Sequence, residues 1–287
     1  MSSQQPDPPA LGPARPATAL VLLGLVLTGC DRGAPEPSAN IAAEAPPSPT
    51  PQKPPAPVPA LSRGDLVTAA GRAASAYAEG RLPGGADPLV GRTFAVRIAF
   101  GCSGPAPGAA PDSAPSGLAS WSPGTDGKTI ELSMTPGDWA GSALLAGGTD
   151  APAWEAVEGF WIPRPWLTSE SCPLVKGDPL QTGEVSAAPQ TLGLAAVFEE
   201  GGSRIGRRNG RAYAFTVRPA GDAPLPPPRQ GYRLLLEGRI ASFPDGRAIR
   251  CRAAGPDQRP VCVVAAKLDR VAFEDAQGTT LTEWRSG

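Results

Sequence analysis

The chain has 287 residues, a formal net charge of −1 and no histidine. A nucleic-acid-binding module carries a strong basic footprint, so this balance of charges argues against that class. The lack of histidine excludes Ser-His-Asp triads, Cys-His pairs and HExxH zinc sites, together with the commonest metal ligand. We therefore expect no metal, no cofactor and no nucleic-acid partner.

An apolar run near the N-terminus is the first feature along the chain. Residues 19–27 are nine uncharged, apolar residues. A membrane-spanning helix needs about 20 such residues to cross a hydrocarbon core of roughly 30 Å. The run is too short for that, and it fits the apolar region of a secretory signal peptide.

The run closes on Leu27-Thr28-Gly29-Cys30, which resembles the lipobox of bacterial lipoproteins. The resemblance covers residues 1–30. It implies cleavage before Cys30, a diacylglyceryl group on the Cys30 thiol and acylation of the new N-terminus. Several acyl chains hold a protein firmly on a membrane, whereas one chain holds it weakly. The resemblance therefore implies a cell-envelope lipoprotein that is anchored to the inner or outer membrane and faces the periplasm.

Two features depart from the usual lipoprotein pattern. The segment before the apolar run is long and proline-rich, and Arg15 is its only basic side chain. Asp31 follows the cysteine and resembles an inner-membrane retention signal of enterobacterial lipoproteins, but the choice of membrane stays open. The alternatives are a plain secretory signal with a chance cysteine at the cut, or a cytoplasmic protein with an apolar start.

A proline-rich segment follows Cys30. Residues 31–60 contain 10 prolines and no aromatic side chain. Such a segment cannot bury enough apolar surface to offset its ordering entropy, and at about 3.1 Å per residue it extends up to roughly 90 Å. The predicted organisation is a signal peptide over 1–29, a lipidated cysteine and tether over 30–61, and a folded periplasmic domain over 62–287.

The folded part is expected to begin with a helix over 63–79. Ser62 is a good N-cap, and Asp65 three residues later complements the helix start. Gly80 is a plausible C-terminal stop. One helical face then carries Leu66, Ala70, Ala73 and Tyr77.

The remaining signals are mostly strands and turns. Alternating apolar residues over 92–102 predict a half-buried strand. Asp126-Gly127 predicts a hairpin between 118–122 and 129–134, and Asn209-Gly210 predicts one between 192–198 and 212–217. Residues 232–243 are expected to turn at 244–246 and return over 247–252. The last predicted strand is 261–273, with a bulge at Asp269-Arg270.

These elements predict a mainly β domain with one N-terminal helix. A barrel or a sandwich closes such a sheet, and an OB-like barrel is one alternative for the C-terminal strands. The prolines within 224–228 suggest a subdomain break near 220–230.

Four cysteines remain after Cys30. An even number in an exported domain indicates two disulfides, and four cysteines allow three connectivities. Cys251 and Cys262 flank a short, turn-rich segment, so we pair them with each other and Cys102 with Cys172. A four-thiolate zinc site is the alternative, but the spacing contains no CxxC pair.

Residues 154–166 form the most unusual stretch of the chain. Five of the six tryptophans lie between Trp121 and Trp166. Aromatic faces beside carboxylates are typical of sugar-binding surfaces, and a glycosidase needs two carboxylates. The simpler interpretation is that the tryptophans are core residues and that Arg164 pairs with a glutamate. The candidate ligand-binding residues are Trp154, Trp161, Trp166 and Arg164, and the candidate catalytic acids are Asp150, Glu155 and Glu158.

A second candidate is the segment 201–211, which contains four arginines and is rich in glycine. Turn amides and guanidinium groups bind phosphate or carboxylate groups of lipid headgroups, lipopolysaccharide or peptidoglycan. A solvated loop tip is the simpler interpretation. The candidate ligand-binding residues here are Arg204, Arg207 and Arg208.

Two apparent catalytic motifs are rejected. Residues 124–129 lack the first glycine of a phosphate-binding loop, since position 122 is Ser122, and a strand follows them. Ser103 is not part of a GxSxG elbow, although a Ser-Lys dyad stays open. The sequence therefore predicts a non-catalytic binding or scaffolding module, whose partner is peptidoglycan or an envelope protein. A carboxylate-dependent glycan hydrolase is the alternative.

Overall fold

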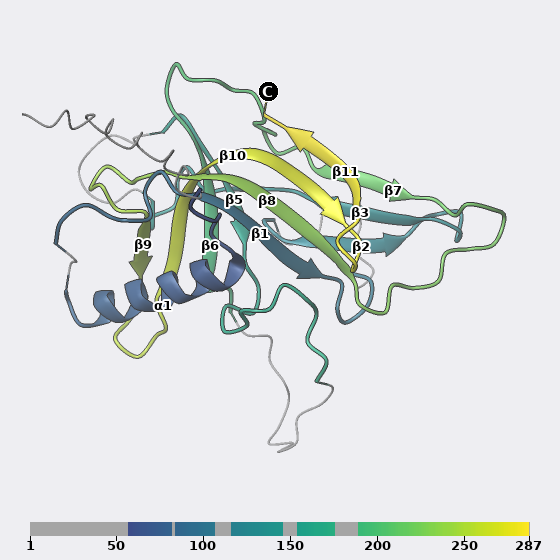
Figure 1. Cartoon of the computed structure of the whole chain (residues 1–287), viewed down its shortest axis with the longest axis horizontal. Coiled ribbons are helices and arrows are strands. Elements are labelled where there is room, and N and C mark those ends of the chain that lie inside the picture. Colours follow the sequence, from purple (N-terminus) through teal and green to yellow (C-terminus); the bar gives the residue numbers. More distant parts are fainter. Residues whose placement is uncertain (1–56, 82–83, 107–115, 146–153, 176–188, 287) are drawn as a thin grey trace, which may run out of the picture. The chain divides into compact units, whose positions relative to one another are not determined.

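The computed structural model describes residues 57–81, 84–106, 116–145, 154–175 and 189–286. Over these residues the protein is mainly β, with one helix, two sheets and two disulfides (Figure 1). The lipobox, residues 30–56 of the predicted tether and Asp150 lie outside them. The predicted tether boundary at 61 is corrected by Leu61, which is buried and forms a bridge with Phe94 of the folded domain. The elements are α1 (Arg63–Ala78), β1 (Thr93–Phe100), β2 (Ala119–Pro123), β3 (Ile130–Met134), β4 (Gly137–Asp138), β5 (Ala156–Trp161), β6 (Leu192–Phe198), β7 (Tyr213–Val217), β8 (Tyr232–Ile240), β9 (Ile249–Arg252), β10 (Val261–Glu274) and β11 (Thr280–Arg285).

The larger sheet has eight strands and is built around the long strand β10. Along one edge β10 pairs with β9 and then β8, and along the other with β6 and then β11. The ladder with β8 shifts register between Leu268 and Arg270, which confirms the predicted bulge. The path β1-β8-β10-β6-β5-β4 crosses the sheet, and only the β6–β10 pair is parallel among the described strands.

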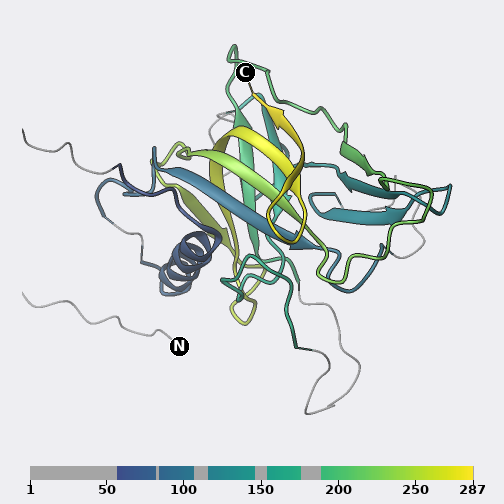
Figure 2. The same ribbon diagram turned by 45° about the vertical axis from the view of Figure 1, so that its right-hand side comes forward.

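The smaller sheet has the order β2-β3-β7. The hairpin at Asp126-Gly127 forms as predicted, because Asp126 accepts backbone N–H groups from Lys128 and Thr129 and Gly127 adopts φ +66°. Figures 1 and 2 show this sheet and α1 at opposite ends of the larger sheet. The two-sheet arrangement is sandwich-like, and the larger sheet is not a closed barrel.

Three predictions of strand pairing were wrong or incomplete. β6 and β7 do not form a hairpin: β6 lies between β5 and β10, and β7 pairs with β3. The returning segment β9 pairs with β10 and not with β8. A further strand, β11, follows β10 after a turn at Asp275–Thr279. Turn signals are local, whereas strand partners are chosen by which apolar faces can be buried together.

The helix α1 begins and ends where the sequence predicts, within one residue. Ser62 and Asp65 form a reciprocal capping box, in which the Ser62 N–H donates to Asp65 Oδ2 at 2.8 Å. This hydrogen bond to Ser62 lowers the pKa of Asp65. Leu66 and Ala70 are buried against the larger sheet, whereas Tyr77 is exposed and accepts the Ala253 N–H through its hydroxyl.

The main core lies on one face of the larger sheet, beneath α1 and the smaller sheet. Alternate residues of β1 and β8 point into it, as expected for strands with period-two patterning. The predicted pattern of β1 is confirmed, with Phe94, Val96, Ile98 and Phe100 all buried.

The opposite face of the larger sheet is covered by loop side chains. Its strands carry small residues there, and Trp139 lies directly over two of them. A Cβ added at Gly159 would approach the Trp139 ring to 2.0 Å, and one at Gly193 would approach it to 2.6 Å. These two glycines therefore make room for the indole of Trp139. On the same face, Trp154 and Phe243 pack together with ring centroids 5.2 Å apart.

Both disulfides expected from the spacing are present. Cys251 and Cys262 face each other directly across the β9–β10 pair, and Cys102 joins Cys172 over a sequence separation of 70. The segment 220–230 connects β7 to β8. It does not divide the domain, because β8 pairs with β1 and residues 56–287 form one compact unit.

Candidate functional site

The structure brings the two candidate regions of the sequence together. The segment 201–211, here called the arginine loop, lies beside Glu155 and Glu158 of the tryptophan-rich stretch. A groove of about 520 Å³, here called the arginine groove, lies between this loop, residues 267–271 of β10 and residues 284–286 at the end of β11.

Glu155 holds the first half of the arginine loop. Its Oε1 lies 2.8 Å from Arg204 Nη2 and 3.0 Å from Arg207 Nη1, and its Oε2 accepts from Arg204 Nε at 3.3 Å. Both carboxylate oxygens are therefore engaged by guanidinium groups. Glu155 acts as an anchor for the loop in this arrangement.

Glu158 holds the second half of the loop through its backbone. Its buried Oε1 accepts the N–H of Arg208 at 2.6 Å and the N–H of Asn209 at 2.8 Å. Burial raises the pKa of Glu158, although these hydrogen bonds and the charges of Arg207 and Arg208 act in the opposite direction. Glu158 also lines the arginine groove, so it is the candidate acid that the structure places in a cleft.

An aromatic pair lies beneath the loop. The guanidinium of Arg208 stacks over the Tyr213 ring at 4.6 Å, and Arg208 Nη2 donates to the Ala212 carbonyl at 2.5 Å. Tyr213 meets Trp284 edge-on at 5.0 Å. Burial, followed by the charge of Glu158, raises the pKa of Tyr213 above its ordinary range. The groove is thus lined by cationic side chains together with the aromatic rings of Tyr213 and Trp284.

Several of the groove's cations already have carboxylate partners. Lys267 pairs with Glu199 at 2.7 Å, and Arg270 bridges Glu237 and Glu283. Arg285 also pairs with Glu283. Among the described residues, no carboxylate forms an ion pair with Arg208 or Arg211, whose side chains donate to backbone carbonyls. These two arginines keep an excess of positive charge on the loop.

The three candidate tryptophans have different environments. Trp154 is 9% exposed and belongs to the core cluster, so it offers no face for stacking. Trp161 is half-buried, with its ring 4.6 Å from that of Trp139. Trp166 is 59% exposed. The structure therefore does not present the three together as an aromatic platform.

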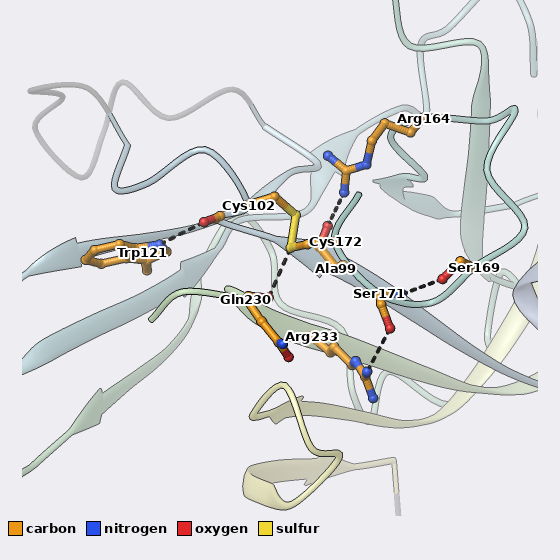
Figure 3. Close-up of a disulfide and its surroundings, with 10 residues drawn as sticks. Ala99, Cys102, Trp121, Arg164, Ser169, Ser171, Cys172, Gln230 and Arg233 are labelled. Carbon is orange, nitrogen blue, oxygen red and sulfur yellow. Dashed lines mark hydrogen bonds between the residues drawn. A yellow bond between two sulfur atoms is a disulfide. The ribbon is translucent and has the colours of Figure 1, made fainter. Parts of the chain in front are cut away.

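Arg164 is half-buried and lies close to the buried Arg63. It adopts φ +53° and donates from Nη2 to the Ala99 carbonyl at 2.6 Å, close to the Cys102–Cys172 disulfide (Figure 3). Among the described residues, no glutamate forms the ion pair with Arg164 that the simpler interpretation expected. Burial and the charge of Arg164 lower the pKa of Arg63 to about 10. Arg63 donates to three backbone carbonyls of the same loop, those of Pro163, Arg164 and Leu167.

Sequence reasoning missed the far wall of the groove. Tyr213, Lys267 and Arg270 belong to strands that were predicted, but nothing in their spacing links them to the arginine loop. Trp284 and Arg285 lie on β11, which was not predicted. The one available signal was Trp284 itself, an isolated tryptophan far from the other five.

Comparisons and searches give no relative from which to transfer a function. No protein-family model, curated protein or solved structure matches the chain. No helix within the described ranges is long and apolar enough to cross a membrane. The same ranges contain no group of three or more histidine, cysteine or acidic residues that could hold a metal ion.

Proposed function

We propose that this chain is a lipid-anchored protein of the bacterial cell envelope, whose β domain faces the periplasm. In this proposal the domain is a non-catalytic binding module, and the arginine groove receives phosphate or carboxylate groups of an envelope component. The observation that carries the proposal is the convergence of the arginine loop with two glutamates that hold it in a fixed shape. The lipid anchor is supported by the lipobox resemblance at Cys30.

The fixed loop favours binding because its arginines are preorganised. Each guanidinium has five N–H donors, and the bonds to Glu155 and to backbone carbonyls use only some of them. Arginine forks match the geometry of phosphate and carboxylate groups. An anion in the groove therefore meets donors that lose little conformational entropy on binding.

The groove is tested by titrating inorganic pyrophosphate into the chain from Asp31 to Gly287, exported behind a cleavable signal so that both disulfides form. We expect saturable binding by calorimetry that weakens as salt is added. Arg204→Gln with Arg211→Gln should weaken it about tenfold or more. The control, Arg72→Gln with Arg259→Gln, removes the same charge from exposed sites elsewhere. Equal binding by the two double variants would contradict the proposal.

The anchor is tested by Cys30→Ala in the full chain. We expect the wild-type protein to pellet with membranes and to carry acyl chains detectable by mass spectrometry. The variant has no thiol to acylate and should lose that modification and move to the soluble fraction. A variant that still pellets after a salt wash contradicts lipid anchoring at Cys30.

A carboxylate-dependent glycan hydrolase is the second candidate, and one observation favours it. Glu158 lines a groove and has a raised pKa, which are properties of a general acid. The discriminating experiment incubates the Asp31–Gly287 chain with peptidoglycan sacculi. Release of soluble fragments that is abolished by Glu158→Gln would support the hydrolase. Absence of release by the folded wild-type chain favours the binding module.

A further inference from the structure

We infer that the arginine loop binds the phosphate headgroups of an anionic lipid surface, with Ile205 entering the boundary between headgroups and acyl chains. This inference rests on the proposed function and specifies the ligand of the arginine groove. It gives the domain a second contact with a membrane, separate from the acyl chains expected on Cys30.

Ile205 is the feature that points to a lipid surface. Its side chain is 58% exposed in the first half of the loop, between Arg204 and Arg207 in the sequence. Arg204 has a side-chain exposure of 70% even though it pairs with Glu155. An aliphatic side chain flanked by cations is typical of segments that lie in a membrane interface. A purely carboxylate or phosphate ligand in water would gain nothing from an exposed isoleucine.

The charge of the loop fits the same partner. Segment 201–211 contains four arginines and no acidic residue. The acids that hold it are Glu155 and Glu158, which gives a formal balance of +2 when both are ionised. Each arginine near an anionic leaflet strengthens binding about fivefold. The exposed Ile205 and the positive charge of the arginines therefore favour the same kind of partner.

The loop is held so that these groups stay at the surface. Glu155 fixes Arg204 and Arg207, Glu158 fixes the backbone at residues 208–209, and Arg208 stacks on Tyr213. Gly206, Asn209 and Gly210 adopt positive φ, which sets the turns on either side of the two central arginines. A loop ordered in this way loses little entropy when it docks.

The expected affinity is modest. A few arginines and one isoleucine give a partition constant on the order of 10⁴ M⁻¹, similar to that of a single acyl chain. A protein that is already anchored to the membrane needs no higher affinity, because the tether converts docking of the loop into an intramolecular step. The contact would then orient the domain on the bilayer.

The test uses the unlipidated Asp31–Gly287 chain and two kinds of vesicle. One contains phosphatidylglycerol and phosphatidylethanolamine, and the other contains only phosphatidylcholine. We expect co-sedimentation with the first kind alone, and a loss of binding at high salt. Arg204→Gln with Arg211→Gln should weaken binding about 25-fold, and Ile205→Ser about tenfold.

Two matched controls accompany these variants. Arg72→Gln with Arg259→Gln removes the same charge, and Val90→Ser removes an apolar side chain that is also exposed. Neither control should reduce binding more than about twofold. Circular dichroism shows whether each variant keeps the fold. The inference would be overturned if the control variants lost as much vesicle binding as the loop variants. It would also be overturned if Ile205→Ser bound anionic vesicles as well as wild type does.

The outcomes also separate the inference from the proposed function. Pyrophosphate binding without vesicle binding leaves the groove as an anion site and overturns the lipid inference. If the protein co-sediments with sacculi and not with vesicles, peptidoglycan is the ligand and the lipid inference is also overturned. If pyrophosphate, vesicles and sacculi all fail to bind, both the inference and the proposed function fall.

Discussion

Removing the Cys102–Cys172 disulfide is expected to lower the free energy of unfolding by about 4 kcal/mol. This disulfide closes a loop with a sequence separation of 70, so its loss returns much conformational entropy to the unfolded chain. The loop includes the smaller sheet's β2–β3 hairpin and the half-buried Arg164. The measurement is chemical denaturation of the Cys102→Ser, Cys172→Ser double variant.

The second disulfide is the internal control for this prediction. Cys251 and Cys262 have a sequence separation of only 11, so the same entropy model gives about 3 kcal/mol for the removal of their disulfide. The entropy model predicts that removing Cys102–Cys172 destabilises the protein more than removing Cys251–Cys262. This ranking tests the model better than either energy alone. A non-reducing peptide map that joins Cys251 to any cysteine other than Cys262 would contradict the pairing itself.

The second large effect is expected for Arg63→Ala, which should lower the free energy of unfolding by about 3 kcal/mol. Arg63 is only 2% exposed, and its guanidinium donates to the carbonyls of Pro163, Arg164 and Leu167. Truncation leaves these acceptors without their donor and opens a cavity at the start of α1. Part of this cost is offset, because the positive charge of Arg164 then loses its like-charged neighbour.

Arg72 on the same helix provides the control. Its side chain is exposed, so Arg72→Ala should change stability by no more than about 0.5 kcal/mol. Arg63→Lys keeps the charge but loses the planar guanidinium fork. Its loss of stability should lie between those of Arg63→Ala and Arg72→Ala. Equal midpoints and slopes for Arg63→Ala and wild type in a urea titration would show that the three carbonyl contacts contribute nothing to folding.

Local elements were predictable because local chemistry decides them. The helix was found from Ser62, Asp65 and Gly80, whose capping roles depend only on near neighbours. The hairpin at Asp126-Gly127 and the bulge beside Arg270 followed from turn chemistry and a break in alternation. At Asn209-Gly210 the same turn chemistry did not predict the strand pairing. The turn conformation is present, but β6 and β7 pair with other strands.

The candidate site was predictable in its parts and not in its assembly. The sequence marked the arginine loop and Glu158 separately, because clusters of charge and aromatic residues are visible in one dimension. Their contact depends on β5 and β6 pairing so that Glu158 reaches the backbone of residues 208–209. The side of the arginine groove opposite the loop includes Trp284, which lies on β11, a strand that was not predicted.

Composition and local pattern by themselves therefore determined the mainly β class, the single helix, the disulfide pairing and the absence of histidine chemistry. They also carry the lipobox resemblance, which lies outside the described residues. The tertiary structure alone decided which strands pair, that Trp154 is a core residue, and that Glu155 and Glu158 hold the arginine loop. The reason is physical. Capping and turn chemistry act between neighbours in sequence, whereas burial of apolar faces joins residues that sequence separates by fifty positions or more, as with Glu158 and Asn209.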